Sequence, residues 1–170
     1  FYPGVLSEEV IPKCAALAAQ EHGDARRALD LLRVAGEIAE RHGDSKITEK
    51  HVDMAQEKID YDRIIESVKS LPKQSKVVLW SIIKLIDDGR EEIQTGDVYA
   101  VYEDLCKEVG LYPLTQRRVS DLISELDMSG IINATVKSLG RYGRTREIKL
   151  NITTSVKDKI KEILKQTLVI

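Results

Sequence analysis

The chain has 170 residues, of which 42% are hydrophobic and 32% charged, a composition typical of soluble globular domains and not of disordered segments. No apolar run approaches the roughly 20 residues that a membrane-spanning helix requires, so we expect no membrane association. No secretory leader pattern follows Phe1, and because the first residue is not methionine we expect the chain to begin inside a longer protein. The length allows one medium domain or two small ones.

The net charge of −2 divides unevenly along the chain. Residues 1–66 hold 9 Lys/Arg and 14 Asp/Glu (net −5), whereas residues 67–170 hold 17 and 14 (net +3). Since salt screens charge beyond about 10 Å, a local basic strip attracts phosphates even on a slightly acidic protein. The two cysteines, Cys14 and Cys106, match no metal-ligand spacing, so we expect buried free thiols and a cytoplasmic, DNA-associated location.

Helical periodicity dominates residues 1–66. Ser7 is expected to cap a first helix, Asp24 a second, and Thr48 a third that runs on toward residue 71. The apolar stripe expected to face the core in the second helix comprises Ala25, Ala28, Leu29, Leu32, Ala35, Ile38 and Ala39. The pattern predicts a helical domain over 1–66 and a second domain over 67–170.

The second domain is expected to begin with Pro72 at the first position of a helix. The expected elements are a buried helix over 77–86, a short strand at 92–94, a helix over 97–109 capped by Thr95, a helix after Thr115, a β-hairpin of 131–138 and 145–150, and a last helix from Ser155. This order is that of a winged helix, in which the third helix enters a major groove and the hairpin, or wing, reaches an adjacent groove. The fold class is therefore mostly α with a two-stranded wing.

The helix after Thr115 and the hairpin carry the expected DNA contacts. One face of the helix is apolar, at Val119, Leu122, Ile123 and Leu126, so the opposite face presents Gln116, Arg117, Arg118, Asp121 and Ser124. Gln and Arg side chains read base edges, a serine or a helix N-terminus binds phosphate, and a glycine-flanked basic tip suits a narrow minor groove. The expected contacts are Gln116, Arg117, Arg118, Ser124, Lys137, Arg141, Tyr142, Arg144 and Arg146.

Competing interpretations of the same residues stay open at this point. Arg117 and Arg118 are equally well explained as a solvated face paired with Asp121 and Glu125, and many winged helices bind proteins instead of DNA. Catalysis and metal binding are not expected, since the three histidines lie in no recognisable catalytic motif and no metal-ligand spacing occurs.

The stretch from His22 to Arg33 (HGDARRALDLLR) resembles the sensor-2 helix in the lid domain of AAA+ ATPases, most closely that of archaeal replication initiators of the Orc/Cdc type. The Gly-x-x-Arg of Gly23 to Arg26, the wing at Leu139 to Arg146, and the order of lid then winged helix are all similar to that family. The resemblance covers essentially the whole chain.

The resemblance implies that Arg26 contacts the terminal phosphate of ATP bound, with magnesium, by a preceding domain of the intact protein. This chain has no Gly-x-x-x-x-Gly-Lys-Ser/Thr loop to cradle phosphates, so we expect no cofactor and no enzyme activity in it. The resemblance further implies that the winged helix binds double-stranded DNA at a replication origin, with the helicase or other initiator subunits as protein partners.

Three alternatives remain from the sequence. The first is a protein-interaction module that docks a replicative helicase or another initiator. The second is the C-terminal part of a Holliday-junction branch-migration ATPase, which has the same domain order. A transcription regulator with a helical dimerisation arm is the third, and its first domain would self-associate.

Overall fold

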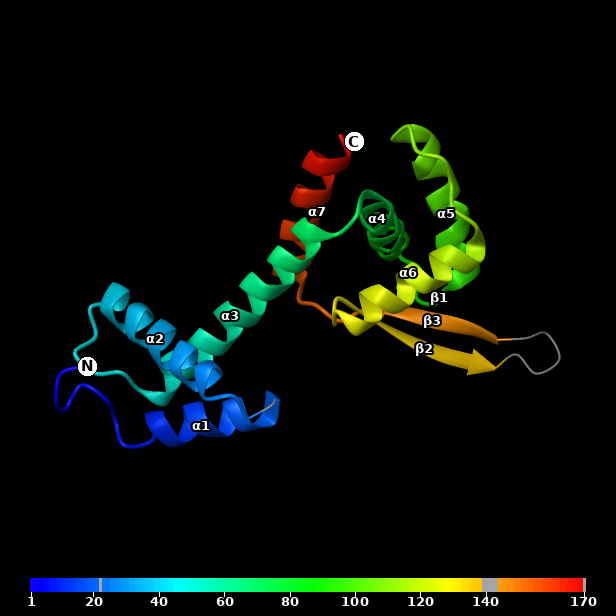
Figure 1. The fold of residues 1–170 in the computed structure, drawn as a ribbon. Helices are drawn as coiled ribbons and strands as arrows, with labels where there is room; N and C mark the ends of the chain where they lie inside the picture. Colours follow the sequence, from blue (N-terminus) through cyan, green and yellow to red (C-terminus); the bar gives the residue numbers. More distant parts are fainter. Residues whose placement is uncertain (22, 139–143, 170) are drawn as a thin grey trace. The chain divides into compact units, whose positions relative to one another are not determined.

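The structure is a computed structural model that describes residues 1–21, 23–138 and 144–169 (Figure 1). It is mostly helical with one small antiparallel sheet, as predicted. The chain divides into two units, residues 1–63 and 64–170, and each is described here by itself. The division falls within helix α3 (Glu49–Ser70), in agreement with the expected helix running toward residue 71.

Three helices build the first unit: α1 (Val10–Glu21), α2 (Ala25–His42) and the first part of α3. Asp24 caps α2 as predicted, because its carboxylate accepts a hydrogen bond from the backbone N–H of Arg26 at 2.9 Å. Gly43 ends α2 with a φ of +74°, a conformation that glycine adopts without strain. The buried core comprises Val10, Cys14, Leu31, Val34, Ala35, Ile38, Ala39, Ile47, Val52 and Ala55.

Two expectations for the first unit were wrong. Ser7 does not cap α1, because the helix begins only at Val10 and Glu8 and Glu9 form a turn before it. The backbone N–H of Ser7 instead donates to the carbonyl of Ile47 at 3.0 Å. Leu29 does not face the core; it is 66% exposed, whereas Leu31 is fully buried. The rest of the expected stripe was largely correct, since Ala35, Ile38 and Ala39 are buried and Ala28 and Leu32 pack against the core. The stripe differs at its start, where Leu31 and Val34 face the core in place of Leu29.

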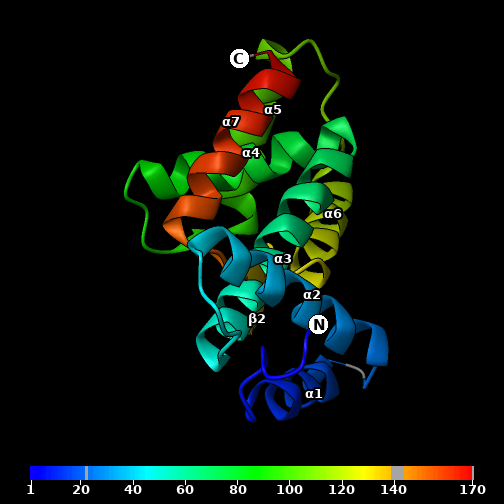
Figure 2. The same ribbon diagram turned by 90° about the vertical axis from the view of Figure 1, so that its left-hand side faces the viewer.

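The second unit is arranged around α4 (Lys73–Asp87), which contacts α5 (Thr95–Glu108), α6 (Gln116–Met128) and α7 (Thr154–Leu168). Figure 2 shows α7 beside α4. The apolar run predicted over 77–86 supplies most of this core, with Val77, Val78, Leu79, Ile82, Ile83 and Leu85 buried. Asp87 also ties α4 to α7, since its carboxylate accepts hydrogen bonds from Lys157 at 2.8 Å and from Lys161.

The sheet of this unit has three antiparallel strands in the order β1 (Ile93–Gln94), β3 (Arg144–Leu150), β2 (Ile132–Ser138). The β2–β3 register places Val136 opposite Arg146 and Ser138 opposite Arg144. Thr95 was expected to cap α5 but is its first residue; Gln94 precedes the helix, and its N–H donates to the Asp97 carboxylate at 2.9 Å.

None of the helices in the described part of the chain is long and apolar enough to cross a membrane.

Candidate nucleic-acid interface

Helix α6 has the orientation that the sequence predicts. Thr115 caps it by accepting a hydrogen bond from the N–H of Arg118 at 3.4 Å. The four apolar residues expected to face inward, Val119, Leu122, Ile123 and Leu126, are all buried. Burial of this stripe fixes the rotation of the helix about its axis, and it leaves Gln116, Arg117, Arg118 and Asp121 exposed.

A buried tyrosine holds the loop that leads into α6. The Tyr102 side chain is fully buried; its hydroxyl donates to Oε1 of Gln74 at 2.5 Å and accepts from the N–H of Leu114 at 3.0 Å. The amide of Gln74 also donates to the carbonyl of Tyr112 at 3.1 Å. Burial raises the pKa of Tyr102 to about 12. The start of α6 is thus attached to α4 and α5 by hydrogen bonds as well as by apolar packing.

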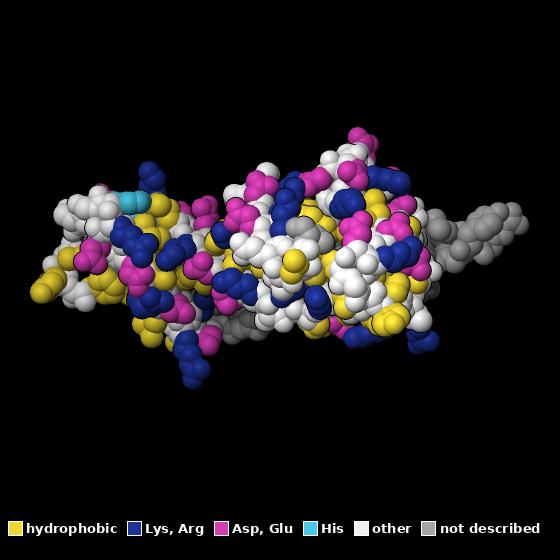
Figure 3. Space-filling view, turned by 90° about the horizontal axis from the view of Figure 1, so that it is seen from above, with side chains coloured by type: hydrophobic (Ala, Val, Ile, Leu, Met, Phe, Trp, Pro, Cys, Tyr) yellow, Lys and Arg dark blue, Asp and Glu magenta, His cyan; other side chains and the backbone are white. Residues whose placement is uncertain are grey.

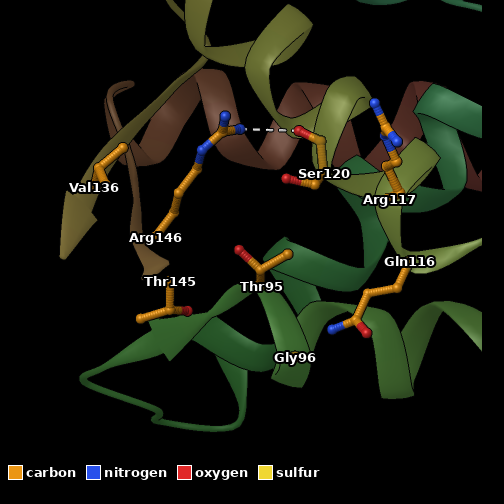
Figure 4. Close-up of a pocket in the computed structure, with 8 residues that line it drawn as sticks. All are labelled: Thr95, Gly96, Gln116, Arg117, Ser120, Val136, Thr145 and Arg146. Atoms are coloured by element: carbon orange, nitrogen blue, oxygen red, sulfur yellow. Dashed lines mark hydrogen bonds between the residues drawn. The ribbon is translucent and has the colours of Figure 1, made fainter. Parts of the chain in front are cut away.

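A cleft of about 520 Å³ lies between α6 and the hairpin formed by β2 and β3 (Figure 4). Its lining residues are Thr95 and Gly96 of α5, Gln116, Arg117 and Ser120 of α6, Val136 of β2, and Thr145 and Arg146 of β3. Three of the expected contact residues, Gln116, Arg117 and Arg146, therefore line one surface. Thr95, Gly96, Ser120, Val136 and Thr145 were missed, because the sequence does not show which side chains of α5 and the strands face α6.

The basic side chains near this cleft differ in their partners. Gln116 and Arg117 make no hydrogen bond or ion pair with any residue that the structure describes, so both are available to a ligand. Arg118 faces two acids of its own helix, Glu125 at 3.4 Å and Asp121 at 3.9 Å. The solvated-face interpretation therefore describes Arg118 but not Arg117.

Two lysines of the hairpin share one carboxylate. Glu147 pairs with Lys137 at 2.6 Å and with Lys149 at 3.1 Å. Hydrogen bonds from the two lysines hold the pKa of the Glu147 carboxyl below its usual value. On the face of the molecule shown in Figure 3, acidic and basic side chains are likewise interspersed over each unit. Near the cleft, Arg118, Lys137 and Lys149 therefore have acidic partners, whereas Arg117 has none among the described residues.

Ser124 was expected on the open face of α6, and this was wrong. It is half-buried, and its hydroxyl donates to the carbonyl of Ser120 at 3.0 Å and accepts from Nη1 of Arg146 at 2.5 Å. The same Nη1 donates to the Ser120 carbonyl at 2.9 Å. Ser124 and Arg146, both expected to contact DNA, therefore contact each other.

The wing tip lies outside the described residues. This concerns Arg141 and Tyr142, and the side chain of Arg144, although the backbone of Arg144 begins β3. Their expected DNA contacts remain predictions.

In the first unit, Arg26 and Arg27 follow each other in the sequence but have different environments. Arg27 pairs with Glu21 and Asp60, each at 2.9 Å, and its side chain is 15% exposed. Arg26 is exposed in the first turn of α2, and its guanidinium has no partner among the described residues. Gly23 precedes the capped turn with a φ of +71°, which favours glycine there. The Gly-x-x-Arg pattern therefore ends in a guanidinium that has no partner among the described residues, at a capped helix start.

One group of side chains has metal-ligand chemistry in the described part of the chain: His42, Asp44 and His51, whose ligand atoms lie within 4.8 Å of one another. The backbone N–H of Thr48 donates to Nδ1 of His51 at 3.1 Å, so the proton of the neutral ring lies on Nε2, which is 3.0 Å from Asp44. A metal ion on Nε2 would displace this proton while Nδ1 still accepts the hydrogen bond from Thr48, and a neutral imidazole cannot do both. The His51 ring, held by Asp44, instead caps the start of α3.

Comparison with known proteins assigns both units. The family described as "Cdc6 AAA+ ATPase-type lid domain" matches residues 1–57, and "CDC6, C terminal winged helix domain" matches residues 66–159. The ORC1-type DNA replication protein of Pyrococcus furiosus is 66% identical over 165 residues, which are 97% of this chain and 39% of that protein. ORC1-type DNA replication protein 1 of Methanosarcina mazei is 62% identical over 151 residues, 88% of this chain and 36% of that protein.

Among solved structures, that of the Aeropyrum pernix ORC1 protein in complex with DNA has a TM-score of 0.85 and 50% sequence identity, and it covers 98% of this chain and 42% of that one. The chain thus spans about two fifths of the length of these relatives. These matches decide between the two AAA+ families considered from the sequence, because both units match Cdc6 domains in the expected order. The chain belongs to the Cdc6 family, and it comprises the AAA+-type lid and the C-terminal winged-helix domain of that family.

Proposed function

We propose that the winged-helix unit binds duplex DNA, with α6 in the major groove and the hairpin at an adjacent groove, and that the intact protein uses it to bind a replication origin. The observation that carries the proposal is the cleft of Figure 4, where the side chains of Gln116 and Arg117 lie beside the hairpin and have no partner among the described residues. A major groove about 12 Å wide admits an α-helix, and both side-chain types form bidentate contacts with base edges. The similarity to a DNA-bound ORC1 structure over 98% of the chain supports it further.

The hairpin tip is part of the same proposal. Arg141 and Arg144 flank Tyr142 in the sequence between β2 and the start of β3, a stretch that contains Gly140 and Gly143. Arginine side chains enter narrow minor grooves, where the negative potential is high. Lys137 lies on the strand that leads to this tip and already pairs with Glu147, so we assign it a secondary role.

The experiment is a fluorescence-anisotropy titration of the 170-residue chain against a labelled 25-base-pair AT-rich duplex at several salt concentrations. We expect log affinity to fall linearly with log salt, with a slope of about −0.9 for each phosphate neutralised. Arg117→Ala weakens binding and, where Arg117 contacts phosphate, flattens the slope by about 0.9. Arg118→Ala is the matched control on the same helix, and its effect is smaller because Glu125 and Asp121 already balance its charge.

Absence of salt-dependent binding at any concentration, or equal losses for the two variants, would refute the proposed interface. The double substitution Arg141→Ala/Arg144→Ala tests the wing separately. Unchanged affinity in that variant would show that the wing does not contribute to the interface and would leave α6 as the proposed contact.

For the intact protein we propose that Arg26 contacts the terminal phosphate of ATP held, with magnesium, by the AAA+ domain of the family. An exposed, unpaired guanidinium on a capped helix start fits this role, because arginine supplies several donors and a permanent charge. Arg26→Ala in the intact protein is expected to reduce ATP hydrolysis without unfolding the lid. Arg27→Ala is the contrasting variant, and because it removes the pairs with Glu21 and Asp60 it lowers lid stability.

A further inference from the structure

The contact between β3 and α6 depends on one side chain. Arg146 extends from β3 toward α6, and Figure 4 shows its guanidinium directed at Ser120. Its Nη1 donates to the Ser120 carbonyl at 2.9 Å and to the Ser124 hydroxyl at 2.5 Å. Arg146 is half-buried, and no carboxylate among the described residues pairs with it. A charged donor shared by two acceptors on one helix turn forms a specific link between the hairpin and the helix.

The position of this link is what makes it important for binding. Ser120 lies one helical turn after Gln116 and Arg117 and lines the same cleft. A duplex that contacts α6 and the hairpin together requires a fixed spacing between them. Side chains held by packing and supporting hydrogen bonds keep binding groups in register.

Resting on the proposed function, we propose that Arg146 is a positioning residue that sets the distance between α6 and the hairpin for DNA. Its contribution to affinity passes through Ser120 and Ser124 and not through a direct contact with a phosphate. This differs from the expectation for a basic residue of a winged-helix hairpin, whose charge would serve the phosphates directly.

The two roles respond differently to lysine. A phosphate contact needs a positive charge within reach, which lysine supplies as a point charge. The link to α6 needs a donor in a fixed planar arrangement at the end of the side chain, which lysine does not supply. Rescue by lysine therefore indicates a phosphate contact, whereas failure of rescue together with an unchanged salt slope indicates positioning.

The experiment measures the Kd of the 170-residue chain for the 25-base-pair AT-rich duplex across a salt series. The variants are Arg146→Gln, Arg146→Lys, Ser124→Ala and the double variant Arg146→Lys/Ser124→Ala, with Arg117→Ala for comparison. Circular dichroism at the assay temperature confirms that each variant is folded.

We expect Arg146→Gln and Arg146→Lys to weaken binding equally, by about tenfold at every salt concentration, with the salt slope unchanged. Ser124→Ala is expected to weaken binding about threefold. The double variant binds no more weakly than Arg146→Lys alone, because both changes break the same link.

Three results would overturn the inference: a slope flattened by about 0.9 in Arg146→Gln and restored in Arg146→Lys, full affinity in Ser124→Ala, or a lowered melting temperature with unchanged Kd in the Arg146 variants. If the unmodified chain does not bind the duplex, the proposed function fails and the inference fails with it. If the unmodified chain and Arg117→Ala behave as proposed, a negative result for Arg146 concerns the inference alone.

Discussion

The hydrogen bonds of Tyr102 predict a large loss of stability from the removal of one oxygen atom. In Tyr102→Phe the ring still fills its buried site, but the N–H of Leu114 loses its partner and Oε1 of Gln74 keeps only the weak thiol donor of Cys106 at 4.0 Å. A buried polar group without a partner costs about 1–3 kcal/mol. Both groups are half-buried, so each falls toward the lower end of that range. The expected decrease in the free energy of unfolding is about 2–3 kcal/mol.

The assay is urea unfolding followed by the fluorescence of Trp80, the only tryptophan, which lies in α4 and reports on the second unit. Tyr112→Phe is the matched control. Tyr112 is 93% exposed, so loss of its hydroxyl is expected to change stability by less than about 0.5 kcal/mol.

Equal stability of the two variants would refute the role assigned to the Tyr102 hydroxyl. The loop that contains Leu114 leads directly into α6, the helix proposed to bind DNA. Tyr102→Phe is therefore expected to weaken duplex binding even without urea, where the unit is fully folded.

Three further predictions concern pH and local stability. Because the pKa of Tyr102 is raised from 10.0 to about 12, the stabilisation from its protonated hydroxyl is complete below pH 10 and lost between pH 10 and 12; the stability difference between the parent chain and Tyr102→Phe should shrink over that window in urea titrations. Hydrogen bonds from Lys157 and Lys161 lower the pKa of Asp87 below 3.8, so Asp87→Asn should cost about 1 kcal/mol at pH 7, and this difference should disappear as the pH falls through the depressed pKa. Gly43→Ala should destabilise the first unit by about 1–2 kcal/mol in thermal melts, because the φ of +74° strains any residue with a Cβ.

The buried side of α6, the helix proposed to face DNA, could be predicted from the sequence, whereas the surroundings of its edges could not. The spacing of Val119, Leu122, Ile123 and Leu126 identifies the core face, because burying apolar side chains stabilises the fold whichever elements they pack against. Ser124 lies at the border of that face. Its environment depends on Arg146, 22 residues later, and so on the order of strands and their register, which the spacing within α6 does not contain.

Helix α2 shows a second limit, because the spacing of its apolar residues does not show which of its leucines face the core. Its sequence contains two overlapping apolar stripes, one with Leu29 and Leu32 and one with Leu31 and Val34. The second is buried, because Leu31 and Val34 lie in one core cluster with residues of α1 and α3. Leu29 is instead exposed and lines an open hollow beside Tyr2, and Leu32 is partly buried against the core. Capping residues such as Asp24 and Thr115 were predicted correctly because a cap acts on the backbone two or three residues away.

The ion pairs on the second unit are compatible with the proposed DNA-binding surface although the chain is negative overall. Glu147 holds Lys137 and Lys149 in place in the absence of DNA, but these lysines are 47% and 67% exposed, and pairs at exposed sites add little net free energy. A phosphate can therefore replace Glu147 as their partner at small cost. Arg117 and Gln116 have no partner to exchange among the described residues, so in the proposed complex we expect them to supply the strongest contacts and the paired lysines to add to them. We therefore expect the local arrangement of free and paired cations, and not the net charge of the chain, to determine DNA binding.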